Sequence, residues 1–232
     1  MTASAGFPVV LITGASGGLG TAVTKAFLDS GAVVAGSSRR IADSAFPYPN
    51  FRAFPADLAD QAQARGLADT VIALHGRIDA LVHVTGGFSG GSPVHESDDA
   101  LWDQMFSVNL RAALHVFRAV IPHMRSAKRG RIVAIGSRAA LEPAPNIAAY
   151  SASKAALVSL VKTVALENRD AGITANAILP GTIDTAANRQ WGTPEERAKW
   201  IPPERLAALA VFLVSDAAAE ITGAAIPVYG GQ

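Results

Sequence analysis

Short apolar stretches rich in β-branched residues alternate along the chain with longer stretches of helical periodicity. The short stretches predict β-strands over residues 9–13, 33–37, 52–54, 80–84, 131–136, 174–179 and 225–228. The longer ones predict helices over residues 19–30, 61–74, 101–126, 148–171 and 203–215. Several of the strand stretches are apolar throughout, which is typical of strands covered by helices on both faces of a sheet.

This alternation predicts an α/β fold: a doubly wound, seven-stranded parallel sheet of the Rossmann type with right-handed crossovers. Neither a linker-like segment nor an internal repeat interrupts it, so we expect residues 1–232 to form a single dinucleotide-binding domain. The least regular region, residues 182–203, contains Trp191 and Trp200. A long segment with its own aromatic residues indicates either a substrate lid or a surface excursion packed by the two tryptophans.

Composition narrows the class of protein. Apolar residues make up 50% of the chain and charged residues 17%, which favours an ordered globular protein. The net charge is +1 without any long run of like charge, so we expect no nucleic-acid and no membrane partner. Cysteine is absent, which excludes disulfides, thiol catalysis and thiolate metal sites. Without a signal peptide or an apolar run of about 20 residues, we expect a cytoplasmic protein.

A glycine-rich turn, Thr-Gly-Ala-Ser-Gly-Gly-Leu-Gly over residues 13–20, follows the first predicted strand. Gly14, Gly18 and Gly20 allow a tight turn, close approach to a pyrophosphate and close helix–strand packing, and the next helix offers free N–H groups. The turn predicts dinucleotide binding, the alternative being an ordinary loop. The contacts expected here are Gly14, Ser16, Gly17, Gly18, Leu19 and Gly20.

The end of the second predicted strand indicates which dinucleotide binds. NAD-binding folds usually carry an acidic residue there to hold the ribose 2′-hydroxyl, and this chain has none. Ser38, Arg39 and Arg40 stand in its place and offer charge-assisted hydrogen bonds to a 2′-phosphate. We therefore expect NADP(H) as the cofactor, the alternative being that the arginines belong to a solvated loop.

Tyr150 and Lys154 lie four residues apart, which places them on one face of a helix. A free tyrosine has a pKa near ~10, and an ammonium nearby favours the phenolate and lowers that pKa. Ser137, just after the predicted strand 131–136, offers a hydrogen bond to a substrate oxygen. These residues predict a proton-transfer site for carbonyl or alcohol chemistry.

Taken together, these segments resemble the short-chain dehydrogenase/reductase family over nearly the whole chain. Asp57-Leu58 is similar to the family's adenine-contacting pair, and Val108-Asn109 to the position of its active-site asparagine. Ser137, Tyr150 and Lys154 match its serine and Tyr-x-x-x-Lys in order and spacing. The resemblance adds further expected cofactor contacts: Asp57, Leu58, Gly86, Tyr150, Lys154, Pro180, Gly181, Thr182 and Ile183.

The resemblance also implies roles. Tyr150 is expected to be the general acid in reduction and the base in oxidation, and Lys154 to bind the nicotinamide ribose. Ser137 polarises the substrate carbonyl, and Asn109 holds a water through a local irregularity of its helix. The implied partner is a small carbonyl or alcohol substrate, no metal is required, and relatives assemble as homotetramers or homodimers.

Two departures from the family pattern leave alternatives open. His83-Val84-Thr85-Gly86 replaces Asn-Asn-Ala-Gly, so only the glycine is kept, and the segment 182–203 is shorter than in many relatives. Residues 84–91, 183–189 and 200–203 resemble loops of the quinonoid dihydropteridine reductases, which reduce a C=N system with NADH and lack the serine. A pterin-type reductase and a non-catalytic NADP(H) sensor are therefore the alternative functions.

Other side chains offer weaker indications. The five histidines lack metal-ligand spacing, and only His83 falls near the expected site. Phe88, Trp191 and Trp200 either line the substrate pocket or pack loops.

Overall fold

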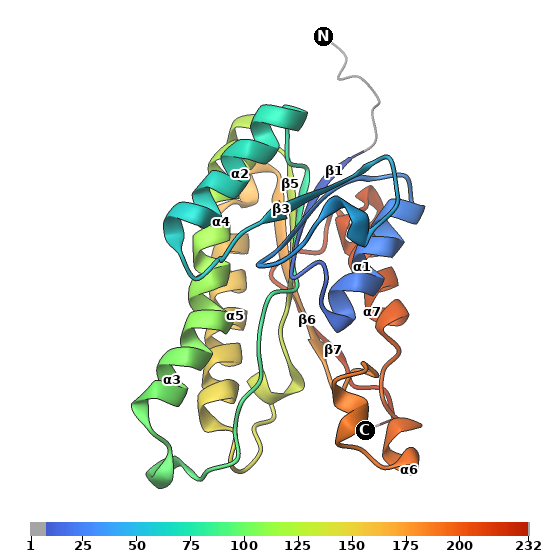
Figure 1. Cartoon of the computed structure of the whole chain (residues 1–232). Helices are drawn as coiled ribbons and strands as arrows, with labels where there is room; N and C mark the ends of the chain where they lie inside the picture. The colour runs from blue at the N-terminus through green and yellow to red at the C-terminus, as the bar shows by residue number, and fades with distance from the viewer. Residues whose placement is uncertain (1–7, 232) are drawn as a thin grey trace.

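A computed structural model describes residues 8–231, and in these residues seven strands form one parallel sheet (Figure 1). The strand order is β3-β2-β1-β4-β5-β6-β7, with every neighbouring pair parallel. This order confirms the doubly wound Rossmann-type fold predicted from the alternating pattern. The strands are β1 (Val9–Thr13), β2 (Val33–Ser38), β3 (Phe51–Pro55), β4 (Ala80–His83), β5 (Gly130–Ile135), β6 (Ile173–Pro180) and β7 (Ala225–Val228).

Helices cover both faces of the sheet (Figure 1). α1 (Gly18–Asp29) and α7 (Pro203–Val214) pack on one face and bury residues such as Phe27 and Leu206. α2 (Gln61–His75), α4 (Ala112–Ala127) and α5 (Ala148–Glu167) pack on the other face, around Phe117. Burial on both sides explains why β1, β4, β5 and β6 read as apolar stretches.

Short helical elements lie between the main helices. The two short α-helices are α3 (Asp99–Phe106) and α6 (Pro194–Arg197). The 3₁₀ turns are η1 (Asp43–Ala45), η2 (Val94–Glu96), η4 (Arg138–Ala140), η5 (Arg169–Ala171), η6 (Asn188–Gln190) and η7 (Asp216–Ala218).

Two of the predicted helices are interrupted. The helix predicted over residues 101–126 contains a π-helical turn, η3 (Ser107–Arg111), between α3 and α4. Such turns occur mostly inside α-helices at functional sites, and this one places Asn109 on the buried side. The helix predicted over 148–171 ends at Glu167, because Asn168 leaves helical geometry, and residues 169–171 form the separate 3₁₀ turn η5, which ends at Gly172 with a positive φ of 68°.

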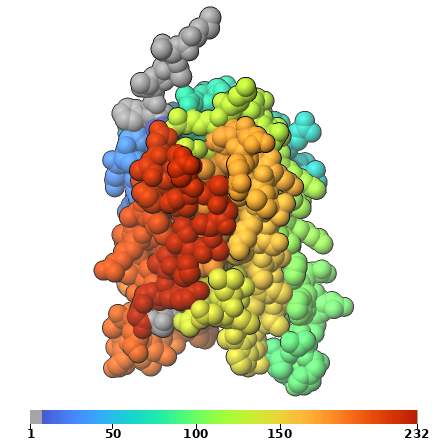
Figure 2. Space-filling view, turned by 180° about the vertical axis from the view of Figure 1, so that it is seen from behind, coloured from blue at the N-terminus to red at the C-terminus, as the bar shows by residue number. Residues whose placement is uncertain are grey.

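The segment over residues 182–203 is irregular, as the sequence indicated, but its base is fixed. Ile183 and Ile201 form a parallel bridge, in which Ile201 N donates to the Thr182 carbonyl oxygen at 2.9 Å. The C-terminal residues hold it as well, since Gly231 N donates to the Lys199 carbonyl oxygen at 3.2 Å. In Figure 2 the C-terminal part of the chain, in red, lies beside α5, in yellow to orange.

The direction in which strands are added to the sheet reverses between β1 and β4, and this reversal creates a place where a ligand can bind. From β1 the chain moves outward to β2 and β3, then returns to β4 on the other side of β1. In such sheets ligands bind at the carboxyl ends of the strands, at this reversal. No helix within residues 8–231 is long and apolar enough to cross a membrane.

Candidate active site

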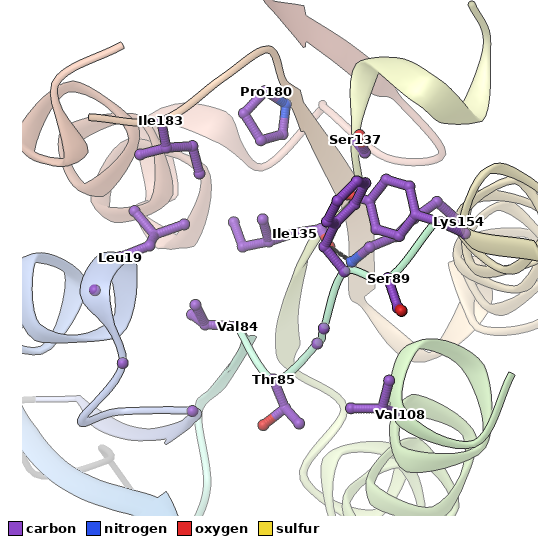
Figure 3. A pocket seen from close by; sticks show the side chains of 18 of the residues that line it. Leu19, Val84, Thr85, Ser89, Val108, Ile135, Ser137, Lys154, Pro180 and Ile183 are labelled. Atoms are coloured by element: carbon purple, nitrogen blue, oxygen red, sulfur yellow. Dashed lines mark hydrogen bonds between the residues drawn. The ribbon is translucent and has the colours of Figure 1, made fainter. Parts of the chain in front are cut away.

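A cleft of about 2140 Å³ opens at the carboxyl ends of the strands. Figure 3 shows Ser137 and Lys154 on one side of it and Leu19 and Ile183 on the other. Every cofactor contact expected from the sequence lines this cleft: Gly14, Ser16, Gly17, Gly18, Leu19, Gly20, Ser38, Arg39, Arg40, Asp57, Leu58, Gly86, Tyr150, Lys154, Pro180, Gly181, Thr182 and Ile183.

The glycine turn between β1 and α1 is too tight for side chains. Gly14 has a φ of +67°, and a Cβ there would lie 2.8 Å from the Thr85 backbone nitrogen. A Cβ on Gly20 would lie 1.9 Å from the Gly14 carbonyl oxygen. These contacts explain two of the glycines: one reverses the chain, and the other lets the helix pack against the turn.

The start of α1 is available to a ligand. Its N-cap is Gly17, which supplies no side-chain cap, and its first turn contains no acidic residue. The N–H groups and the positive end of the helix dipole therefore face the cleft without a carboxylate to neutralise them. Together with the glycine turn, these groups fit the pyrophosphate of a dinucleotide.

The end of β2 carries the positive charge that the sequence indicated. Arg39 and Arg40 are exposed at the cleft, and neither forms an ion pair with another residue of the 8–231 range. Ser38 Oγ accepts a hydrogen bond from Ser16 N at 3.2 Å, which joins the end of β2 to the glycine turn. A phosphate bound here would meet two guanidinium groups and one hydroxyl.

The turn that carries Asp57 and Leu58 is held by hydrogen bonds from two sides. Asp57 Oδ1 accepts from Ala59 N at 3.0 Å, and the Leu58 carbonyl oxygen lies 3.0 Å from His115 Nδ1. The contact of His115 with this turn was not expected from the sequence. No local sequence pattern could predict this contact, because 57 residues separate His115 from Leu58.

Ser137, Tyr150 and Lys154 meet at the other end of the cleft. Ser137 follows β5, while Tyr150 and Lys154 lie one turn apart on α5. Burial raises the pKa of the Tyr150 phenol, and a hydrogen bond with the Ser137 side chain opposes that rise. From the spacing we expected Lys154 to lower this pKa, whereas the group that opposes its rise is Ser137.

Lys154 is turned toward the main chain of β5, which explains this difference. Its Nζ donates a hydrogen bond to the Ile135 carbonyl oxygen at 2.9 Å (Figure 3). The side chain is only 5% exposed, and burial lowers the pKa of its ammonium to about 8.

Asn109 lies behind the cleft wall and does not line the cleft. Its Oδ1 accepts from Gly87 N at 2.9 Å, and its Nδ2 donates to the Gly87 carbonyl oxygen and to Ser153 Oγ, each at 3.0 Å. A Cβ on Gly86 would lie 2.9 Å from Asn109 Oδ1 and 3.1 Å from Lys154 Nζ. Gly86 is the one residue kept from the family's Asn-Asn-Ala-Gly. Any side chain at this position would come between Asn109 and Lys154.

His83 supports the site from outside the cleft. It is fully buried, and its Nδ1 lies 2.9 Å from Thr13 Oγ1, so it joins the ends of β4 and β1. Its ring also meets Phe117 edge-on at 6.0 Å. Burial, followed by the nearby charge of Lys154, lowers the pKa of His83 to about 3, so the ring is neutral.

Two further contacts at the cleft were missed from the sequence. Arg138, next to Ser137, pairs with Glu142 at 2.7 Å and lies over the Tyr229 ring at 5.0 Å. The spacing of Arg138 and Glu142 was an i,i+4 signal in the sequence, whereas Tyr229 is distant in sequence.

The sequence left undecided whether Phe88, Trp191 and Trp200 line the substrate pocket or pack loops. All three line the cleft. Residues 8–231 contain no His/Cys/Asp/Glu cluster suited to a metal ion.

Residues 8–196 match the family model described as short chain dehydrogenase. The chain belongs to this family. As a short-chain dehydrogenase/reductase it is an oxidoreductase of a group that binds a nicotinamide cofactor, which agrees with the glycine turn and the free start of α1.

Individual relatives match this short-chain dehydrogenase/reductase over nearly its whole length. A D-threitol dehydrogenase from Mycolicibacterium smegmatis is 35% identical, over 96% of this chain and 92% of its own length. A 3-ketoacyl-(acyl-carrier-protein) reductase from Brucella melitensis, solved with NADH, superposes with a TM-score of 0.90 at 28% identity, covering 97% of this chain and 98% of the other. ElxO, solved with NADP bound, superposes with a TM-score of 0.91 at 26% identity and the same two coverages.

Proposed function

We propose that this protein is an NADP(H)-dependent reductase that converts a carbonyl to a secondary alcohol, or catalyses the reverse reaction, with Tyr150 as general acid and base. The observation that carries the proposal is the convergence of Ser137, Tyr150 and Lys154 on the cleft, at the opposite end from the arginines that follow β2. A substrate oxygen beside Ser137 and Tyr150 meets two hydroxyl donors.

The bound cofactor supplies the hydride, and with it the two electrons that reduce the carbonyl carbon. The chain's own residues handle the oxygen and the proton. Ser137 donates a hydrogen bond to the carbonyl oxygen and holds it next to the phenol. Tyr150 donates the proton that turns this oxygen into a hydroxyl, and takes it back in the oxidation direction.

Lys154 and Asn109 support this transfer. Lys154 follows Tyr150 by one turn of α5 and lines the cleft, where its ammonium would bind the ribose hydroxyls of the nicotinamide cofactor. Asn109 fixes the peptide unit of Gly87, and so the wall against which the nicotinamide end of the cofactor would rest. In this proposal Asn109 also holds a water that relays protons from Lys154.

The preference for NADP(H) rests on Arg39 and Arg40. Both are exposed at the cleft without an ion-pair partner within residues 8–231, and no acidic residue stands directly at the end of β2 to hold a 2′-hydroxyl. A 2′-phosphate would satisfy both guanidinium groups. We also propose that residues 182–203 form a lid, because this segment contributes Trp191 and Trp200 to the cleft.

The decisive experiment compares the wild type with Tyr150→Phe, which keeps the ring and removes only the hydroxyl. The oxidation of NADPH is followed with ketones, 3-oxoacyl thioesters and quinonoid pterins, and NADPH affinity is measured by fluorescence titration. We expect turnover of a ketone by the wild type, a loss of at least about 100-fold in Tyr150→Phe, and nearly unchanged NADPH affinity.

Each other outcome excludes the proposal in a defined way. Turnover of pterins alone would identify a C=N reductase. Tight NADPH binding without any turnover would identify a sensor. Full activity of Tyr150→Phe would remove the phenol from the mechanism.

A further inference from the structure

The ring of Phe88 contacts the ring of Tyr150, whose phenol is the proton donor in the proposed reaction. The two rings meet edge-on, with centroids 5.0 Å apart and planes at 77°. Phe88 nevertheless keeps 67% of its surface exposed. One side of the ring is therefore in contact with Tyr150, while most of its surface remains open.

The loop that carries Phe88 is fixed on both sides of it. Gly87 is held by both hydrogen bonds to the buried amide of Asn109. On the other side, Gly91 N donates to the Asn146 carbonyl oxygen at 2.7 Å. Gly90 lies so close to this segment that a Cβ there would be 2.8 Å from the same oxygen. Phe88 and Ser89 are thus the tip of an anchored loop, and the position of the ring is built into the fold.

Several of the charged side chains that line the cleft are occupied by their neighbours. Arg138 is paired with Glu142 and lies over Tyr229, and Glu196 closes a capping box with Thr193. The apolar side chains that line the cleft include Phe88, Met105, Val108, Pro143, Ile147 and Trp191. A substrate with many hydroxyls would place them against these apolar surfaces, at a cost in lost hydration.

We propose that Phe88 determines specificity, and that the substrate is a neutral ketone conjugated to or fused with an aromatic ring, which packs against the open surface of Phe88. This inference rests on the proposed function, because it places the carbonyl oxygen at Tyr150 and Ser137. An oxygen held there brings its substituents beside Phe88. A flat ring gains both burial of apolar area and an aromatic contact at this position.

The test compares α-tetralone, a fused-ring ketone, with butan-2-one, a small acyclic ketone. In Phe88→Ala we expect the ratio of kcat/KM for α-tetralone to that for butan-2-one to fall about tenfold, mostly through KM. Phe88→Trp, which restores an aromatic surface, should recover most of the preference. Val94→Ala is the matched control, because Val94 is another exposed apolar side chain on the following segment and does not line the cleft.

A second measurement does not depend on turnover. Binding of 2-naphthol, a flat-ring hydroxyl compound without a ketone, is measured by calorimetry in the presence of NADP⁺. We expect about tenfold weaker binding to Phe88→Ala than to the wild type and no change in Val94→Ala.

The outcomes separate this inference from the proposed function. Binding of 2-naphthol that depends on Phe88, without reduction of any ketone, would contradict the reaction and leave the ring site in place. Two results in Phe88→Ala would overturn the inference and leave the proposed reductase function in place. One is an equal fall in kcat/KM for α-tetralone and butan-2-one, and the other is an unchanged affinity for 2-naphthol.

Discussion

The side-chain amide of Asn109 and the peptide unit of Gly87 form a reciprocal pair of hydrogen bonds, at 2.9 Å to the N–H and 3.0 Å from the carbonyl. The same amide also donates to Ser153 Oγ on α5. One buried residue in a π-helical turn therefore ties together three segments: its own helix, the loop that carries Phe88, and the helix that carries Tyr150.

This relationship predicts that Asn109→Ala lowers both stability and activity. The N–H and carbonyl of Gly87 would lose their partner, so we expect the free energy of unfolding to fall by about 2–3 kcal/mol in urea titrations. We also expect kcat to fall, because Gly87 and Tyr150 would no longer be held in one frame. Asn109→Asp keeps the acceptor and should bind Gly87 N, but it cannot donate to the Gly87 carbonyl. A loss of stability below about 0.5 kcal/mol in Asn109→Ala would contradict this account.

The fold was predictable because its signals are local. Buried parallel strands read as apolar stretches, and Gly14 and Gly20 occur where a turn must be tight. The expected contacts also came from short segments, each at the end of a strand. Since the carboxyl ends of parallel strands meet at one edge, segments far apart in sequence were bound to converge there.

The features of the site that could not be predicted from the sequence depend on contacts between residues far apart in the chain. Thr13 and His83 are 70 residues apart and meet only because β1 and β4 are adjacent. The pKa direction of Tyr150 could not be read from the spacing to Lys154 either. Burial raises this pKa and Ser137 opposes the rise, while the ammonium of Lys154 is directed at a main-chain oxygen of β5.

Ser137→Ala should change the pH dependence as well as the rate. Burial raises the pKa of Tyr150 and Ser137 opposes that rise, so removing Ser137 should raise this pKa further. Alcohol oxidation needs the phenolate, so its rise with pH should begin at a higher pH in the variant. We expect kcat to fall by about 100-fold, because one donor to the substrate oxygen is lost.

The pH profile of kcat/KM for alcohol oxidation, measured with saturating NADP⁺, provides the check. Ser151→Ala is a suitable control, since the buried hydroxyl of Ser151 also lies near Tyr150 on α5 but has no hydrogen-bond partner within residues 8–231. An unshifted profile in Ser137→Ala would show that Ser137 does not influence the phenol.

Arg39→Ala should alter the choice of cofactor. A charge-assisted contact to a 2′-phosphate contributes about 1.5–3 kcal/mol, so we expect the Kd for NADPH to rise about 10- to 100-fold. NADH lacks this phosphate, and its Kd should change far less. Arg65→Ala, which removes an exposed arginine of α2 that lies outside the cleft, should change neither Kd. Equal weakening of both cofactors in Arg39→Ala would assign the arginine to general attraction of anions rather than to the 2′-phosphate.

His83 predicts a loss of stability in acid. In the unfolded chain a histidine takes up a proton near pH 6.5, whereas burial lowers the pKa of His83 in the folded protein to about 3. Between these values the unfolded state binds the extra proton, so lowering the pH favours unfolding. The contribution is complete above pH 6.5 and decreases by about 1.4 kcal/mol per pH unit below it. Urea titrations from pH 7 to pH 4.5 should therefore show a steeper loss for the wild type than for His83→Asn. His95→Asn, at an exposed position, should follow the wild type, and parallel curves for His83→Asn and the wild type would exclude a neutral buried His83.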